Sequence, residues 1–212
     1  NIPFLIRVAK KKKPMILSTG MSFLKEVAVA VEALRRNGMR QFALLHCVSD
    51  YPADPRDANL KAMDVLAAAF QVPVGFSDHT LGIEVALAAV ARGACIVEKH
   101  ITLDKNLPGP DHAASLEPAG LRSLVQGVRI VEAALGSGKK VPAPCEVGNR
   151  KVVRRSLAAL RDIAPGEVLD EDMLCALRPG HGISPNLIRQ VVGKKASSSI
   201  RQGRLIQWQN LQ

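Results

Sequence analysis

Short apolar runs alternate with longer helical patterns in the N-terminal part of the chain, and this alternation restricts the possible folds more than any other feature. The expected strands span residues 15–18, 42–48, 74–77 and 95–100, and the expected helices span 22–36, 58–70, 82–91 and 118–135. Residues 1–13 are expected to form the helix of a preceding unit. Strands that are each followed by a helix build parallel sheets or barrels. The sequence therefore predicts an α/β fold that corresponds to half of a βα barrel.

Two of these runs end in a histidine. The run that starts at Val74 leads to His79, and the run that starts at Cys95 leads to His100. Because chemistry in such barrels gathers at the carboxyl ends of the strands, we expect both imidazoles to emerge side by side. Two neutral imidazoles with nearby carboxylates and open positions for water or substrate can hold a divalent metal. From these residues alone, two capped histidines with a structural role remain an alternative.

The composition changes after residue 135. Gly136 and Gly138 are followed by Pro142 and Pro144, a pattern that is typical of a linker. We predict a barrel domain over 1–138, a linker over 139–150 and a small β-rich domain over 151–212. Turn signals at 164–167, 178–182 and 201–203 divide this last segment into short strands.

The chain is strongly basic, with a formal net charge of +10 over 212 residues. Aromatic residues are only 3% of the chain, which argues against surfaces that stack on bases, and no nucleic-acid recognition motif is visible. Small anionic substrates such as phosphates and carboxylates fit the charge better, because a cationic cleft attracts them. The run Lys10–Lys13 is also readily explained as a solvated helix end.

Compartment signals favour the cytoplasm. No apolar stretch is long enough to span a bilayer, and the apolar residues at Asn1–Ile6 precede the basic ones, which is the reverse of a signal peptide. The four cysteines are widely spaced and form no CxxC motif, so we expect reduced thiols, with Cys47 and Cys95 buried in strands. Nucleic acid and membrane are not expected partners.

An ordered set of motifs resembles the bacterial sialic acid synthases, the N-acetylneuraminate synthase family. The set comprises I-L-S-T-G-M at 16–21, L-H-C at 45–47, Y-P at 51–52, F-S-D-H-T-L-G at 76–82, E-K-H at 98–100, P-G-P-D-H at 108–112, S-L-E-P at 115–118 and R-P-G-H-G at 178–182. The resemblance covers essentially the whole chain. It implies the C-terminal half of a (β/α)8 TIM barrel, βα units five to eight, followed by an SAF or antifreeze-like domain.

The resemblance also implies a reaction and a cofactor. Phosphoenolpyruvate, N-acetylmannosamine (or a related 2-acetamido or diacetamido hexose) and water would give a nonulosonic acid and phosphate, as in a transferase that forms carbon–carbon bonds. His79 and His100 would hold Mn²⁺ or Mg²⁺, which acts as a Lewis acid on the aldehyde of the sugar. Glu98 is expected either to orient a metal-binding histidine or to be an ordinary carboxylate at the strand end.

Further roles come from matching positions of the family. Ser18 and Ser77 match residues that hydrogen-bond phosphoenolpyruvate, and Ser49 falls where some members carry an asparagine near the substrates. Tyr51 and Asp111 match residues that contact the sugar hydroxyls and, with the two histidines, complete the predicted catalytic set.

Arg178 matches an arginine that reaches the acetamido group of the sugar from the neighbouring subunit. The resemblance therefore implies a domain-swapped homodimer.

Other polar residues have weaker assignments. His46 is expected to be structural, His112 and His181 to be loop residues, and Lys99 either to face a phosphate or to point outward. Cys47 and Cys95 are not expected to be nucleophiles.

Two alternatives to an N-acetylmannosamine-specific synthase remain open at this point. One is a legionaminic or pseudaminic acid synthase, and the other is a truncated, non-catalytic paralogue that acts as a binding or dimerisation module. The second alternative arises because family members carry a Lys-Ile-x-Ser-x-Glu stretch before the position that matches Asn1. Barrel strands one to four and part of the phosphoenolpyruvate site are therefore expected to lie outside this chain.

Overall fold

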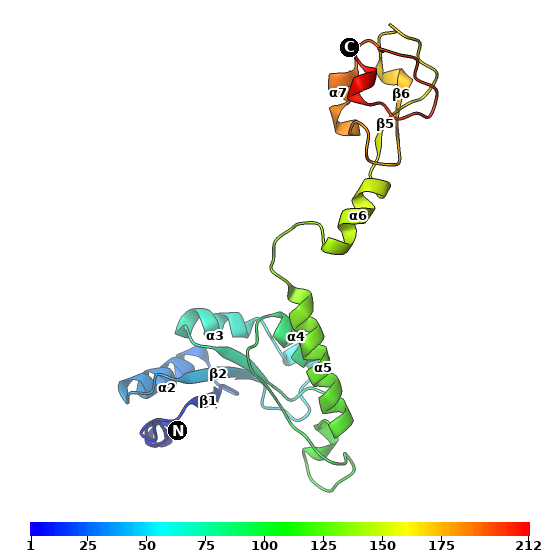
Figure 1. Ribbon diagram of the computed structural model, residues 1–212. Helices are drawn as coiled ribbons and strands as arrows, with labels where there is room; N and C mark the ends of the chain where they lie inside the picture. The colour runs from blue at the N-terminus through cyan, green and yellow to red at the C-terminus, as the bar shows by residue number, and fades with distance from the viewer. The chain divides into compact units, whose positions relative to one another are not determined.

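The computed structural model describes residues 1–212, which divide into two compact units, Asn1–Gly138 and Lys139–Gln212 (Figure 1). The N-terminal unit contains a four-stranded sheet in the order β1-β2-β3-β4. Its strands are β1 (Met15–Ser18), β2 (Phe42–Cys47), β3 (Val74–Asp78) and β4 (Val97–Lys99), and its helices are α1 (Ile2–Ala9), α2 (Leu24–Arg36), α3 (Ala62–Phe70), α4 (Glu84–Ala91) and α5 (Pro118–Leu135).

All neighbouring strands of this sheet are parallel, which confirms the predicted half-barrel. The register pairs Cys47 with Ser77, and Asp78 with Lys99. The carboxyl ends of the strands are therefore level with one another. Residues that follow β2, β3 and β4 meet at one edge of the sheet, where parallel barrels place their sites.

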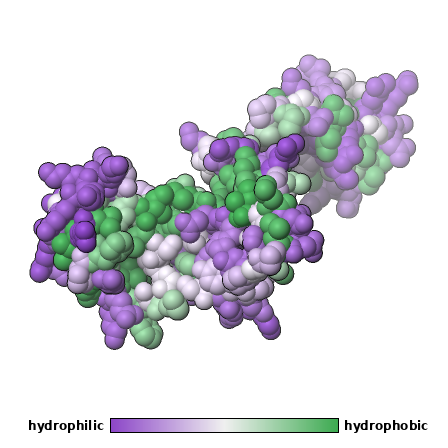
Figure 2. All heavy atoms as spheres, turned by 90° about the horizontal axis from the view of Figure 1, so that it is seen from below, coloured by the Kyte–Doolittle hydropathy of each residue, from purple (hydrophilic) through white to green (hydrophobic).

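The core of the N-terminal unit lies between the sheet and its helices. Val27, Val31 and Leu34 of α2 recur at helical spacing and are almost fully buried, and they belong to one cluster with Leu44 and Phe76 of the sheet. This apolar face explains why residues 24–36 fold as a helix against the strands. Apolar side chains also reach the surface of the chain (Figure 2), and Ile16 on the edge strand β1 is 58% exposed.

Helix α2 begins at Leu24 rather than at residue 22. Neither Thr19 nor Ser22 caps α2, because Thr19 donates its hydroxyl to the carbonyl of Leu45, and the carboxylate of Glu26 accepts from the backbone N–H of Phe23 instead. The third helix begins at Ala62 rather than at residue 58. The reason is a short 3-10 turn at Pro55–Asp57, followed by Asn59 with a positive φ of 40°, a conformation that interrupts a helix.

The last strand is shorter than expected. β4 begins at Val97, so Cys95 precedes it and is exposed, which contradicts the prediction of a buried thiol. Its thiol donates to the carbonyl of Val74 at 3.2 Å. Helix α4 begins at Glu84 instead of residue 82, because Gly82 has a positive φ of 74°.

The C-terminal unit contains α6 (Pro144–Val153), β5 (Ser156–Ala159), β6 (Leu174–Leu177) and α7 (Ile188–Val191). Strands β5 and β6 are antiparallel, and isolated bridges such as Ile163 with Ile200 extend the β structure. Its own core holds the buried residues Leu157, Ile163, Leu169, Val191 and Ile206. This unit confirms the prediction of a small β-rich fold.

The segment 139–150, expected to be a linker, contains the start of helix α6. A proline in the first turn and Glu146, whose carboxylate accepts from the N–H of Ala143 at 2.7 Å, together form a helix start within the Pro-rich segment. The chain contains no helix with the length and apolar character needed to span a membrane.

Candidate functional site

His79 and His100 lie side by side at the carboxyl edge of the sheet. Each directly follows the last residue of its strand, and those last residues are register partners. The two imidazoles meet edge to face with ring centroids 5.2 Å apart. The structure thus brings together the pair that the sequence singled out.

Hydrogen bonding fixes the ring of His79. Its side chain is buried, and Nδ1 lies 2.7 Å from the carbonyl oxygen of Val48, which can only accept. The hydrogen of neutral His79 therefore sits on Nδ1, and Nε2 keeps its lone pair. The thiol of Cys47 lies 3.8 Å from the same Nδ1.

Tyr51 packs against both histidines. Its ring centroid is 4.1 Å from that of His79 and 5.4 Å from that of His100. Partial burial, followed by electrostatic interactions with Cys47, Asp111 and Glu98, raises the pKa of the Tyr51 hydroxyl. The phenol therefore remains protonated near neutral pH and can donate a hydrogen bond.

Asp111 approaches His100 from the long loop after β4. Its Oδ2 is 3.8 Å from Nδ1 of His100, and the carboxylate is half exposed. This distance permits an electrostatic contact but is too long for a hydrogen bond. A cavity of about 350 Å³ opens here and is lined by His100, Ile101, Pro110, Asp111, His112 and Ser115.

Ser77 and Glu98 face each other across β3 and β4. The Ser77 hydroxyl is buried and donates to Oε1 of Glu98 at 2.6 Å. The hydrogen-bond partner of Glu98 is thus a predicted phosphoenolpyruvate-binding serine, not a histidine.

Ser18 and Ser49 lie at the same edge but make no hydrogen bond to the histidines. Ser18 ends β1 and is exposed, and Ser49 follows β2, with its Oγ 3.9 Å from the sulfur of Cys47. Their predicted roles remain predictions.

The donor set suits a labile divalent cation. His79 offers a free Nε2 and His100 lies beside it, while no group of three or more His, Cys, Asp or Glu side chains is positioned to hold a metal ion. Two imidazoles leave several coordination positions to water and substrate, unlike the closed set of four protein ligands in a structural zinc site.

Sequence reasoning missed the partner of Lys99. Its ammonium neither faces a phosphate nor points outward, but forms a buried ion pair with Asp78 at 2.8 Å. Two other histidines make hydrogen bonds within the fold: His46 Nε2 lies 2.8 Å from the carbonyl of Ala58, and His112 Nδ1 lies 2.7 Å from the hydroxyl of Thr102.

Arg178 belongs to the C-terminal unit. Its side chain is exposed, and Nε donates to the carbonyl of Val153, the last residue of α6, at 3.0 Å. The loop that follows is fixed by the buried Ser156, which donates to the carbonyl of Pro179 at 2.7 Å and accepts from the N–H of Gly182 at 2.8 Å. His181 lies exposed in this loop.

Replacing Ser156 by alanine is expected to lower the stability of the C-terminal unit by about 2 kcal/mol, because the partly buried carbonyl of Pro179 and N–H of Gly182 lose the buried hydroxyl that joins them. Denaturant unfolding followed by the fluorescence of Trp208, the single tryptophan of the chain, measures this loss. The exposed Ser198→Ala serves as the control. Equal stability of the two variants would contradict the assigned role of Ser156.

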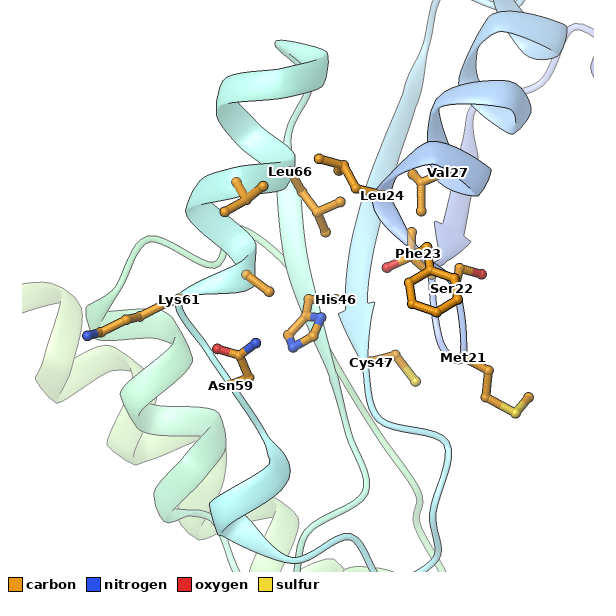
Figure 3. Close-up of a pocket in the computed structure, with 13 residues that line it drawn as sticks. Met21, Ser22, Phe23, Leu24, Val27, His46, Cys47, Asn59, Lys61 and Leu66 are labelled. Carbon is orange, nitrogen blue, oxygen red and sulfur yellow. The ribbon is translucent and has the colours of Figure 1, made fainter.

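A second cavity of about 510 Å³ lies between α2 and α3 (Figure 3). His46 and Asn59 border it, and Lys61 extends away from it. None of the predicted site residues lines this cavity. The histidine pair and this larger cavity are therefore separate features.

Two family patterns match the chain, and both of its units are covered. The NeuB family pattern matches residues 1–140, and the SAF domain pattern matches residues 154–212. The N,N'-diacetyllegionaminic acid synthase of Legionella pneumophila is 47% identical over all of this chain, and human N-acetylneuraminate-9-phosphate synthase is 41% identical over 95% of it. The chain spans 61% and 56% of the length of these two relatives.

A solved structure agrees with these matches. The sialic acid synthetase of Leptospira borgpetersenii superposes with a TM-score of 0.65 at 41% identity, over 70% of this chain and 52% of the other. Sequence identity and structural similarity therefore lead to the same group of proteins.

Proposed function

The chain belongs to the NeuB family. From this premise we propose that it functions as a nonulosonic acid synthase. In the proposed reaction, phosphoenolpyruvate, a 2-acetamido hexose and water give a nonulosonic acid and phosphate. One observation carries the proposal: the pairing of His79 and His100, with Tyr51 packed against both rings. The compartment we propose is the cytoplasm, where the four free cysteines would stay reduced.

The proposal assigns the metal to His79 and His100. A bound Mn²⁺ or Mg²⁺ would polarise the sugar aldehyde as a Lewis acid. The carbonyl of Val48 holds the His79 ring in the tautomer whose Nε2 is free, so this histidine needs no reorganisation to act as a ligand.

Other residues would orient the two substrates. The neutral Tyr51 hydroxyl donates to a sugar hydroxyl, while the half-exposed Asp111 carboxylate accepts from one. Ser77, together with Ser18 and Ser49, would hold phosphoenolpyruvate without repelling its charge. Because Ser77 already donates to Glu98, binding of phosphoenolpyruvate would replace or share that hydrogen bond.

The acceptor sugar we favour is a diacetamido hexose. The identity to the Legionella synthase named for N,N'-diacetyllegionaminic acid exceeds the identity to the human synthase named for N-acetylneuraminate 9-phosphate. N-acetylmannosamine is the second candidate. In a domain-swapped homodimer, Arg178 from the C-terminal unit of the partner would contact an acetamido group of the sugar. Light scattering of the purified protein tests for that dimer.

The decisive test is phosphate release from phosphoenolpyruvate with Mn²⁺ and each acceptor sugar. The chain is assayed by itself and after mixing with the N-terminal segment of a full-length family relative. We expect metal-dependent release, faster with the diacetamido sugar. Absence of release in both arms, with association of the two polypeptides shown by sedimentation, would replace this proposal by a non-catalytic binding module.

A further inference from the structure

A buried ion pair joins the two residues that immediately precede His79 and His100. Nζ of Lys99 is 2.8 Å from Oδ2 of Asp78, and these side chains are only 4% and 0% exposed. Lys99 also donates to the carbonyl of Thr80. The other carboxylate oxygen, Oδ1 of Asp78, accepts from the N–H and the hydroxyl of Thr80 at 2.9 and 2.8 Å. Every oxygen of the carboxylate is therefore engaged.

The position of this pair in the sheet gives it a role. Asp78 ends β3 and Lys99 ends β4, and the two are register partners. His79 and His100 are the next residues along each strand. The ion pair therefore crosslinks the two strand ends one residue before the imidazoles emerge.

The pair itself does not face the proposed substrates. Side chains alternate between the two faces of a strand, so Asp78 and Lys99 lie on the opposite face from Ser77 and Glu98, which face each other. Removal of one member would leave a buried charge without a partner, and the strand end would have to move to hydrate it.

We infer that Lys99 and Asp78 are positioning residues that set the separation of His79 and His100 and thereby the affinity for a divalent metal. This inference rests on the proposed function, because it assumes that the two histidines bind the metal. Partners that orient metal ligands typically contribute about 10- to 100-fold to metal affinity.

The test measures Mn²⁺ binding to the full chain by electron paramagnetic resonance, which needs no substrate and no turnover. The double variant Asp78→Asn/Lys99→Met removes both charges together, so that neither is left buried and unpaired. We expect its Mn²⁺ affinity to fall by about 10- to 100-fold while its circular dichroism stays native. The control is Arg92→Met, which removes the exposed Arg92–Asp64 ion pair far from the strand ends and should bind Mn²⁺ normally.

A milder variant tests the inference if the double variant does not fold. Thr80→Val keeps every charge and removes one hydrogen bond to Asp78, and we expect it to weaken Mn²⁺ binding several-fold. Native Mn²⁺ affinity in a folded double variant, or in Thr80→Val where the double variant does not fold, would overturn the inference. Failure of the wild-type chain to bind Mn²⁺ in a manner that depends on His79 would instead overturn the proposed metal site, so the two failures are distinguishable.

Discussion

Replacement of His79 by alanine is expected to lower Mn²⁺ affinity by at least about 100-fold and kcat/KM by at least about 1,000-fold, the largest functional effect of any single substitution in this chain. The site offers two imidazoles and no further cluster of protein ligands, so the loss of one removes half of the protein donors. Calorimetric titration with Mn²⁺ gives the affinity, and phosphate release in the complemented assay gives the rate.

The matched control is His46→Gln. His46 also lies near the end of a strand, but its Nε2 contacts the carbonyl of Ala58, and glutamine keeps a donor for that carbonyl. We expect this variant to bind Mn²⁺ like the wild type. An equal loss of Mn²⁺ affinity in His46→Gln and His79→Ala would mean that neither result reports on a metal site, and the assignment of His79 would fall.

The strand ends were predictable from sequence because two independent signals coincide there. Apolar runs without alternation indicate buried parallel strands, and polar residues that end such runs must meet at one edge of the sheet. These two signals predict that His79 lies beside His100, and the structure confirms that placement. The structure also confirms the expected helix at Pro118–Leu135, which a proline opens and a glycine follows.

Pairing between side chains was not predictable in the same way. A lysine between a glutamate and a histidine has no periodic signature, and the partner of Lys99 depends on the register of two strands that are distant in sequence. The expected start of α2 differs from the observed one for a related reason. Thr19 is a good capping residue by type, but its hydroxyl is engaged by Leu45 of the neighbouring strand, a tertiary contact that overrides the local preference.

Gly75→Ala is expected to cause the largest loss of stability in the N-terminal unit, about 3 kcal/mol. A Cβ at this position in β3 would meet the backbone carbonyl of Ile96, and it would lie 2.6 Å from Cδ2 of Leu45 and 2.8 Å from Cβ of Ile96. The carbonyl of Ile96 accepts the N–H of Phe76, so it cannot move without loosening the sheet. Thermal unfolding followed by far-ultraviolet circular dichroism measures the loss.

Gly120→Ala separates this steric effect from the general effect of adding a methyl group. Gly120 lies in helix α5, where a new Cβ would meet only the Leu116 side chain, at 3.2 Å from Cδ2 and at ordinary contact distances from Cβ and Cγ, and alanine favours a helix. We expect its stability to stay within about 1 kcal/mol of the wild type. Because Gly75 lies between β2 and β4, its replacement should also push the strand that carries His100 away from the strand that carries His79. A Gly75→Ala chain that unfolds like Gly120→Ala and binds Mn²⁺ normally would show that the spacing of β3 and β4 is not what holds the two histidines together.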